Sequence, residues 1–225
     1  MKLLTLFGLA LFAGAMSLGF FYGGVFKKVE PTTLDGFLGA YEIYKALALE
    51  QDGALIAMSL GENPERLRLN SGLQAVIAAQ TPHVIRMDQA ETTLNALTNL
   101  RAELKTIEEQ NISIKAAIDD LDREARGLEG ESRRPASDLA ALAFKKFGLV
   151  ERIAEQSRIL FDRTERVIKG VLDEDGVLTE KFLSMLQSDL PQAQKDNAEF
   201  NSLFEDFSRV NDAIKAKYSE ISGSI

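Results

Sequence analysis

The chain has 225 residues, a formal net charge of −8 at pH 7, one histidine and no cysteine. Its acidic excess would repel nucleic-acid phosphates, so we expect no nucleic-acid partner. The lone His83 and the missing cysteines argue against a catalytic triad, a histidine-paired cysteine nucleophile and a histidine-rich metal site. We therefore expect a protein that is not an enzyme and that holds no metal ion and no cofactor.

The first 30 residues are the most distinctive feature of the chain. Residues 3–26 carry no charge, and Lys27 and Lys28 close this run. A helix of this length rises about 36 Å, which is enough to cross a hydrocarbon core of about 30 Å with some tilt. We therefore predict a single transmembrane helix within a membrane anchor of the signal-anchor type at residues 1–30.

A cleaved secretory signal is the alternative for this segment. Lys2 supplies a basic start, the residues after it an apolar stretch, and Ala13-Gly14-Ala15 a small-residue cleavage pattern. The apolar run continues past that point to Phe26, which favours retention. In both cases the opening is that of an export signal. We expect a single-pass membrane protein with the bulk of the chain extracytoplasmic, and periplasmic if the source is Gram-negative.

Small residues recur every four positions within the predicted anchor, at Ala15, Gly19 and Gly23. Such a face lets another membrane helix approach closely. Glycine is also frequent in membrane spans in general, so composition alone is the competing explanation. We take the three residues as candidates for packing against a partner or a second copy.

The segment after the anchor is predicted to be helical. Thr32 and Thr33 suit a helix start, and apolar residues follow at spacings of three and four up to Met58. This pattern predicts a helix over about 33–60, weakened at Gly53. The next four residues, Gly-Glu-Asn-Pro, are typical of a turn.

Three long helices are predicted in the rest of the chain. A heptad seam extends to about residue 128, and helices follow over about 136–173 and 179–222. Pro82 interrupts the seam, and we expect the chain to reverse there, because an uninterrupted return helix would outrun the helix before it. Pro191 is expected to kink or break the last helix.

These patterns predict an all-α fold in which the transmembrane helix is followed by an elongated antiparallel helical bundle with coiled-coil-like packing. Residues 1–30 would be the anchor. Residues 31–81 would form a membrane-proximal helical hairpin or stalk, and residues 82–225 a bundle of three long helices.

Three asparagines, Asn111, Asn197 and Asn211, fall where the seams expect aliphatic side chains. A buried asparagine lowers stability but fixes helix register, because only one alignment pairs the amides. The alternative is that these amides reach water at the edge of the bundle. We take them as candidate register residues.

Four arginines surround the predicted loop at about 127–134, namely Arg123, Arg126, Arg133 and Arg134. They are suited to an anionic partner, or they balance nearby glutamates. The first 30 residues carry three lysines and one glutamate, a net charge of +2, which leaves −10 for the other 195 residues. The basic cluster is therefore a local exception in an acidic region.

The leading functional hypothesis is a membrane-anchored scaffold or adaptor subunit that binds other envelope proteins or associates with itself as a homo-oligomer. A sensory or ligand-binding bundle that relays through a partner is the second hypothesis. A secreted helical binding protein, released by signal cleavage, is the third.

Overall fold

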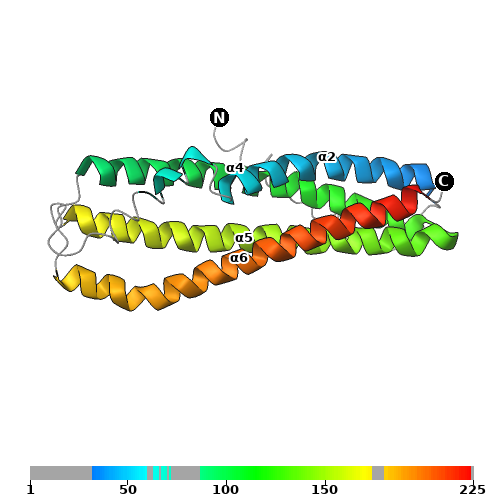
Figure 1. The fold of residues 1–225 in the computed structure, drawn as a ribbon. Helices are drawn as coiled ribbons and strands as arrows, with labels where there is room; N and C mark the ends of the chain where they lie inside the picture. Colours follow the sequence, from blue (N-terminus) through cyan, green and yellow to red (C-terminus); the bar gives the residue numbers. More distant parts are fainter. Residues whose placement is uncertain are drawn as a thin grey trace, which may run out of the picture.

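The computed structural model describes residues 32–59, 63–65, 67–69, 71, 87–173 and 180–223. Four long helices contain most of them, and Figure 1 shows these helices lying lengthwise beside one another. The described residues contain no strand, so the predicted all-α fold and helical bundle are confirmed. The helices are α2 (Leu34–Ser59), α4 (Met87–Gly127), α5 (Arg133–Asp173) and α6 (Glu180–Ser222), with the short 3-10 helix η1 (Gly130–Ser132) before α5.

Helix α2 begins where the sequence predicts a start. The backbone N–H of Gly36 donates to Thr33 Oγ1 at 3.2 Å, and the N–H of Phe37 donates to the Thr33 carbonyl at 3.2 Å. Thr33 therefore satisfies amides that have no partner within the helix. The helix continues through Gly53 to Ser59 without a break.

Helices α4, α5 and α6 have 41, 41 and 43 residues, each close to the predicted length. Each rises about 60 Å, which makes the bundle long and narrow. The loop before α5 is shorter than predicted, because η1 runs directly into a helix that starts at Arg133. Gly130 provides the left-handed turn, with φ of 71°. Helix α6 includes Pro191, so no break occurs there.

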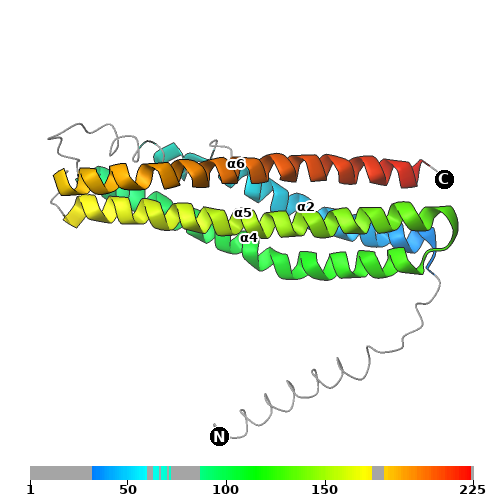
Figure 2. The ribbon, with the colours of Figure 1, turned by 90° about the horizontal axis from the view of Figure 1, so that it is seen from below.

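Neighbouring helices in the bundle run in opposite directions (Figure 2). Helix α4 packs along both α2 and α5, and α5 also packs along α6. The start of α2 lies at the end of α4, where the N–H of Thr32 donates to the Gly127 carbonyl at 3.0 Å. The chain therefore reverses between Ser59 and Met87.

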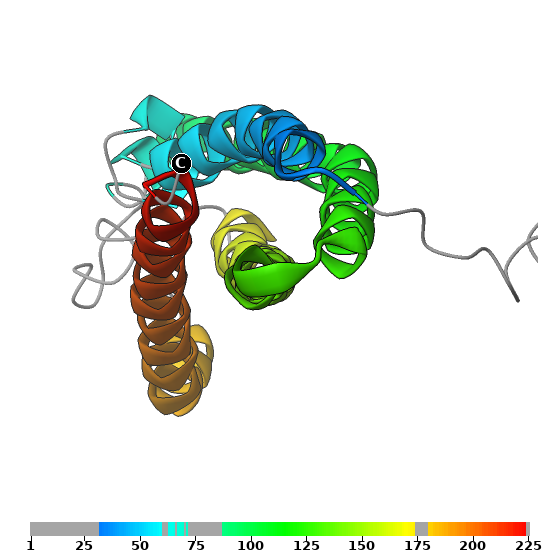
Figure 3. The same cartoon turned by 90° about the vertical axis from the view of Figure 1, so that its right-hand side faces the viewer.

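Helix α6 is inclined to the others. Its end lies beside the start of α2, and its start is far from α2 (Figures 1 and 3). The rings of Tyr41 and Tyr218 stack with centroids 4.2 Å apart, and Tyr218 Oη donates to Glu42 Oε1 at 3.0 Å. In the opposite half of the bundle α6 packs mainly on α5.

One hydrophobic core joins all four helices. Each buried leucine, isoleucine or phenylalanine contributes about 1.5–3 kcal/mol through removal of its side chain from water. The predicted seams supply most of the residues in this core. They include Phe37, Tyr44 and Leu55 on α2, Leu100, Ile107, Ile118 and Leu121 on α4, Leu139, Val150, Ile153 and Phe161 on α5, and Phe200, Phe207 and Ile214 on α6.

Several predictions concern residues outside the described ranges. These are the membrane anchor at residues 1–30 with Ala15, Gly19 and Gly23, and the reversal at Pro82. Within the described ranges, no helix combines the length and the apolar character needed to cross a bilayer.

Candidate functional site

A layer of polar side chains crosses the interior of the bundle. We call it the polar layer, and it consists of Gln51 and Asp52 on α2, Asn111 on α4, Lys146 on α5 and Asn211 on α6. Two of its members are the asparagines that the sequence placed on apolar seams. All four long helices contribute to it.

Gln51 connects α2 to α4. Its amide Nε2 donates to the Ile107 carbonyl at 2.9 Å and to Asn111 Oδ1 at 2.7 Å. Beside this contact, at the exposed edge of the same two helices, Gln110 Nε2 donates to Glu50 Oε1 at 3.1 Å. Because these bonds need matching heights on the two helices, they favour one alignment of α2 along α4.

Lys146 connects α5 to α2 and α6. Its ammonium Nζ donates to Asp52 Oδ2 at 2.5 Å and to Asn211 Oδ1 at 3.0 Å, and it lies 5.3 Å from the centre of the Phe207 ring. The two charged residues are only 5% and 6% exposed. Asp52 Oδ1 is buried without a hydrogen-bond partner among the described residues.

Burial dominates the electrostatics of this ion pair. It raises the pKa of the Asp52 carboxyl, against the opposing effect of the Lys146 charge and hydrogen bond. Burial also lowers the pKa of the Lys146 ammonium, against the attraction of Asp52. Both charges therefore lose more on leaving water than they regain from each other, which is the usual balance for a buried pair.

The chemistry of the polar layer suits alignment of helices better than catalysis. The amine and the carboxylate bind each other and are almost fully buried, so neither faces a substrate that arrives from solvent. In the described part of the chain, no group of histidine, cysteine, aspartate and glutamate is arranged to hold a metal ion. The hydrogen bonds of the layer join side chains or carbonyls from all four long helices.

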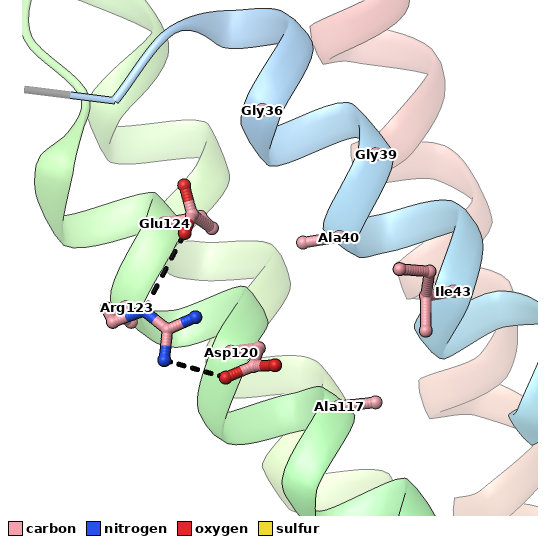
Figure 4. A pocket seen from close by; sticks show the side chains of 8 residues that line it. All are labelled: Gly36, Gly39, Ala40, Ile43, Ala117, Asp120, Arg123 and Glu124. Carbon is pink, nitrogen blue, oxygen red and sulfur yellow. Dashed lines mark ion pairs between the residues drawn. The ribbon is translucent and has the colours of Figure 1, made fainter.

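A surface cavity of about 370 Å³ lies between α2 and α4 (Figure 4). We call it the α2–α4 groove. The side chains of Ala40 and Ala117 point into it, and Arg123 lies at its rim with ion pairs to Asp120 at 2.7 Å and Glu124 at 3.7 Å. Its lining consists of Gly36, Gly39, Ala40 and Ile43 on α2 and Ala117, Asp120, Arg123 and Glu124 on α4.

The predicted site residues have different surroundings. Asn111 and Asn211 are half-buried and accept hydrogen bonds inside the polar layer. Asn197 is exposed. The candidate packing residues Ala15, Gly19 and Gly23 lie outside the described residues. Among the loop arginines, Arg126 forms an ion pair with Asp122 at 2.6 Å, and Arg123 forms one with Asp120 at 2.7 Å. Both partners lie on the same helix as the arginine.

Sequence reasoning missed Asp52 and Lys146. The signal for Lys146 is its place on the α5 seam, three residues after Ala143 and four before Val150, both of which are buried. The signal for Asp52 is similar, since it follows the seam residue Ala48 by four positions. A charged residue at a seam position needs a buried partner of opposite charge, and Asp52 and Lys146 are partners of each other.

Comparison with known proteins adds no relative. No protein-family model matches the chain, and neither the curated proteins nor the solved structures provide a match. The functional conclusion therefore depends on the residues and their geometry alone.

Proposed function

We propose that the protein is a membrane-anchored, extracytoplasmic scaffold or adaptor, whose helical bundle presents long surfaces to other envelope proteins or to a second copy. The uncharged run at residues 3–26 would hold the chain in the membrane as a signal-anchor. The heptad seams of the long helices would pack in a coiled-coil-like manner and keep the bundle rigid.

One observation carries this proposal, namely the position of Thr32. This residue follows the uncharged run by six positions and lies at one end of the bundle, hydrogen-bonded to Gly127. Six residues span at most roughly 20 Å. A bundle attached at its end projects away from the attachment point, so its full length of about 60 Å would be accessible to partners.

Exposed apolar side chains support a role in association. Leu49 is 69% exposed and Ile112 is 79% exposed, each on the outside of a helix. Single exposed apolar residues are common on soluble proteins. Leu49 and Ile112 nevertheless provide two surface positions at which a crosslinking probe can detect a bound partner.

The test combines membrane fractionation with photo-crosslinking of the full chain. We expect the chain to stay in membranes after an alkaline carbonate wash, and a chain that begins at Val29 to be released. A photo-reactive residue at Leu49 or Ile112 should give discrete crosslinked products, and the same probe at Lys169, on the far end of α5, serves as the control. Release of the full chain by carbonate would contradict the anchor. Absence of any discrete product would contradict the scaffold role.

The α2–α4 groove favours a second candidate, a small-ligand-binding bundle. Its volume of about 370 Å³ lies at the small end of the range for ligand sites. A thermal-shift screen separates the two functions, because a ligand that binds only the folded state raises the melting temperature. A reproducible upward shift that is lost in Gly39→Leu would favour ligand binding.

A further inference from the structure

Helices α4, α5 and α6 are joined to one another by ion pairs. Arg101 of α4 pairs with Glu165 of α5 at 2.5 Å, and Arg163 of α5 pairs with Asp196 of α6 at 2.7 Å. Further ion pairs between these helices lie nearer the loop before α5. Because α5 packs along both α4 and α6, the three helices form one unit, which we call the α4–α5–α6 unit.

Helix α2 is held to this unit in a different way. It packs along α4 (Figure 1), and its contacts with α5 and α6 are few. Within the described ranges, a single ion pair joins α2 to another helix, namely Asp52 with Lys146 at 2.5 Å. That ion pair lies in the interior of the bundle, whereas most of those within the α4–α5–α6 unit are at least partly exposed.

The Asp52–Lys146 pair makes separation of α2 easier than an apolar contact would. Asp52 interrupts the buried face of α2 between Ala48 and Leu55, and its Oδ1 has no hydrogen-bond partner among the described residues. When α2 separates, both charges return to water, and the cost of burying them is recovered. Two apolar side chains at these positions would instead become exposed to water and would oppose the separation.

The polar layer also makes the closed position specific. The bonds from Lys146 to Asp52 and from Gln51 to Asn111 form only when α2 lies at one height along its neighbours. A helix that leaves and returns would therefore close in the same alignment. Easy separation and specific closure are the two properties of an element that opens reversibly.

We propose that α2 opens as one element from the α4–α5–α6 unit, and that the buried Asp52–Lys146 pair controls the fraction of molecules that are open. The open form exposes the part of the apolar core that α2 covers, which gives a surface for association that the closed bundle lacks. Opening requires neither the membrane anchor nor a partner, so release of the chain by carbonate would leave this proposal unaffected.

Thiol labelling of the full chain measures the opening, since the chain has no cysteine of its own. Ala48→Cys is a reporter on α2, where the residue is 6% exposed, and Ala154→Cys is a reporter on α5, where the residue is 2% exposed. At reagent concentrations where the rate is proportional to the reagent, each rate reports how often the thiol is uncovered. We expect Ala48→Cys to react at least about tenfold faster and with a weaker dependence on urea, because opening exposes less surface than unfolding.

Ile168→Val tests whether α2 moves separately. Ile168 is 1% exposed and lies about 33 Å along α5 from Lys146, the residue through which α5 binds α2. The smaller side chain weakens the α4–α5–α6 unit in the open and closed forms alike. It should therefore speed the labelling of Ala154→Cys by about twofold to tenfold and leave that of Ala48→Cys unchanged.

Variants of the ion pair should move the Ala48→Cys rate in opposite directions. Lys146→Met leaves the Asp52 charge buried and unpaired until α2 opens, so labelling should accelerate by about a hundredfold or more. Asp52→Leu with Lys146→Met leaves no charge to return to water, so labelling should become slower than in the parent by about tenfold. The matched control is Glu109→Leu with Lys105→Met, which removes an exposed ion pair within α4 and should change the rate less than about twofold.

The outcomes distinguish opening of α2 from unfolding of the bundle. Equal rates with equal urea dependence at the two reporters, or faster labelling of both in Ile168→Val, would mean that α2 separates only when the whole bundle unfolds, and would overturn the proposal. A double variant of the pair that labels as fast as the parent would overturn the role of the Asp52–Lys146 pair. If circular dichroism shows that the double variant has lost helix, Asp52→Asn with Lys146→Gln removes both charges with a smaller change of shape, and it should likewise label more slowly than the parent.

Discussion

Two stretches of α6 each carry an asparagine at the same seam position, but the two asparagines have different environments. Asn197 and Asn211 lie 14 residues apart, which is two heptads, so both fall on one face of the helix. Asn211 accepts a hydrogen bond from Lys146 inside the bundle, whereas Asn197 is exposed. The difference arises because the end of α6 lies beside α2, and its earlier part packs mainly on α5.

This comparison shows that a polar residue on a seam gains a structural role only where another helix covers it. Near Asn211, the second half of α2 supplies Asp52, whose carboxylate pairs with the same Lys146 ammonium that Asn211 contacts. Near Asn197, the neighbouring Asp196 pairs with Arg163 of α5 at 2.7 Å, and the opposite side of α6 has no comparable cover among the described helices. Stability measurements on variants at these positions would show whether the two environments differ in energy as they do in geometry.

The largest effect is expected from Lys146→Met. This change leaves the Asp52 carboxylate buried without its partner, which destabilises a protein by about 3–5 kcal/mol. Urea unfolding of a chain that begins at Val29 measures the loss. Lys105→Met, in an ion pair whose side chains are 75% and 66% exposed, is the control and should change stability by less than about 0.5 kcal/mol.

The double change Asp52→Leu with Lys146→Met sharpens this result. It removes both charges, and with them the cost of burying them, so most of the stability lost in Lys146→Met should return. A double variant no more stable than Lys146→Met would mean that the ion pair itself, and not the unpaired charge, accounts for the loss.

The next effect compares the two asparagines directly. Asn211→Leu removes one acceptor from the Lys146 ammonium, which costs about 1–2 kcal/mol because the donor stays buried. Asn197→Leu changes an exposed position and should stay within about 0.5 kcal/mol of the parent chain. Equal losses in unfolding experiments would show that the two seam positions are equivalent after all.

Much of the fold follows from the sequence for a physical reason. Apolar spacing of three and four predicts the long helices, because helices are stabilised by the face that they bury. The Thr33 cap and the turn at Gly130 are local, and the residues involved are close in sequence. These features depend on short segments, so a sequence pattern is enough to locate them.

The polar layer could be predicted only in part. Asn111 and Asn211 interrupt aliphatic seams and are visible in the sequence, but their partners lie 60 and 65 residues away. The exposure of Asn197 depends on the inclination of α6, and the groove depends on the relative height of α2 and α4. Such properties arise from packing between distant segments, which helix periodicity does not determine.

A smaller effect is expected where α2 and α6 meet at the surface. Tyr218→Leu keeps an apolar side chain but removes the ring that stacks on Tyr41, at an interplanar angle of 16°. We expect a loss of about 1 kcal/mol in urea unfolding, the usual contribution of an aromatic pair beyond its buried area. Tyr218→Phe keeps the ring and loses only the exposed hydrogen bond to Glu42, so it should cost less than Tyr218→Leu.

The smallest effect concerns pH and again contrasts the interior with the surface. Burial raises the pKa of the Asp52 carboxyl above its ordinary value of 3.8, so the folded chain favours the protonated form. The stability that comes from this preference is fully present below pH 3.8 and is lost as pH rises through the folded-state pKa. Asp52→Asn keeps a neutral side chain at every pH. From pH 7 to pH 4, the parent chain should therefore gain stability relative to Asp52→Asn, as measured by urea unfolding at each pH.

Glu42 provides the opposite sign in the same helix. Hydrogen bonds from Lys45 and Tyr218 lower the pKa of Glu42, so its contribution is present above the unfolded-state pKa and is lost as pH falls through the folded-state pKa. Relative to Glu42→Gln, the parent chain should then lose stability on acidification. If the parent chain also lost stability on acidification relative to Asp52→Asn, burial would not dominate at the Asp52 carboxylate. The polar layer would then be open to water, and the contrast between Asn211 and Asn197 would have no energetic basis.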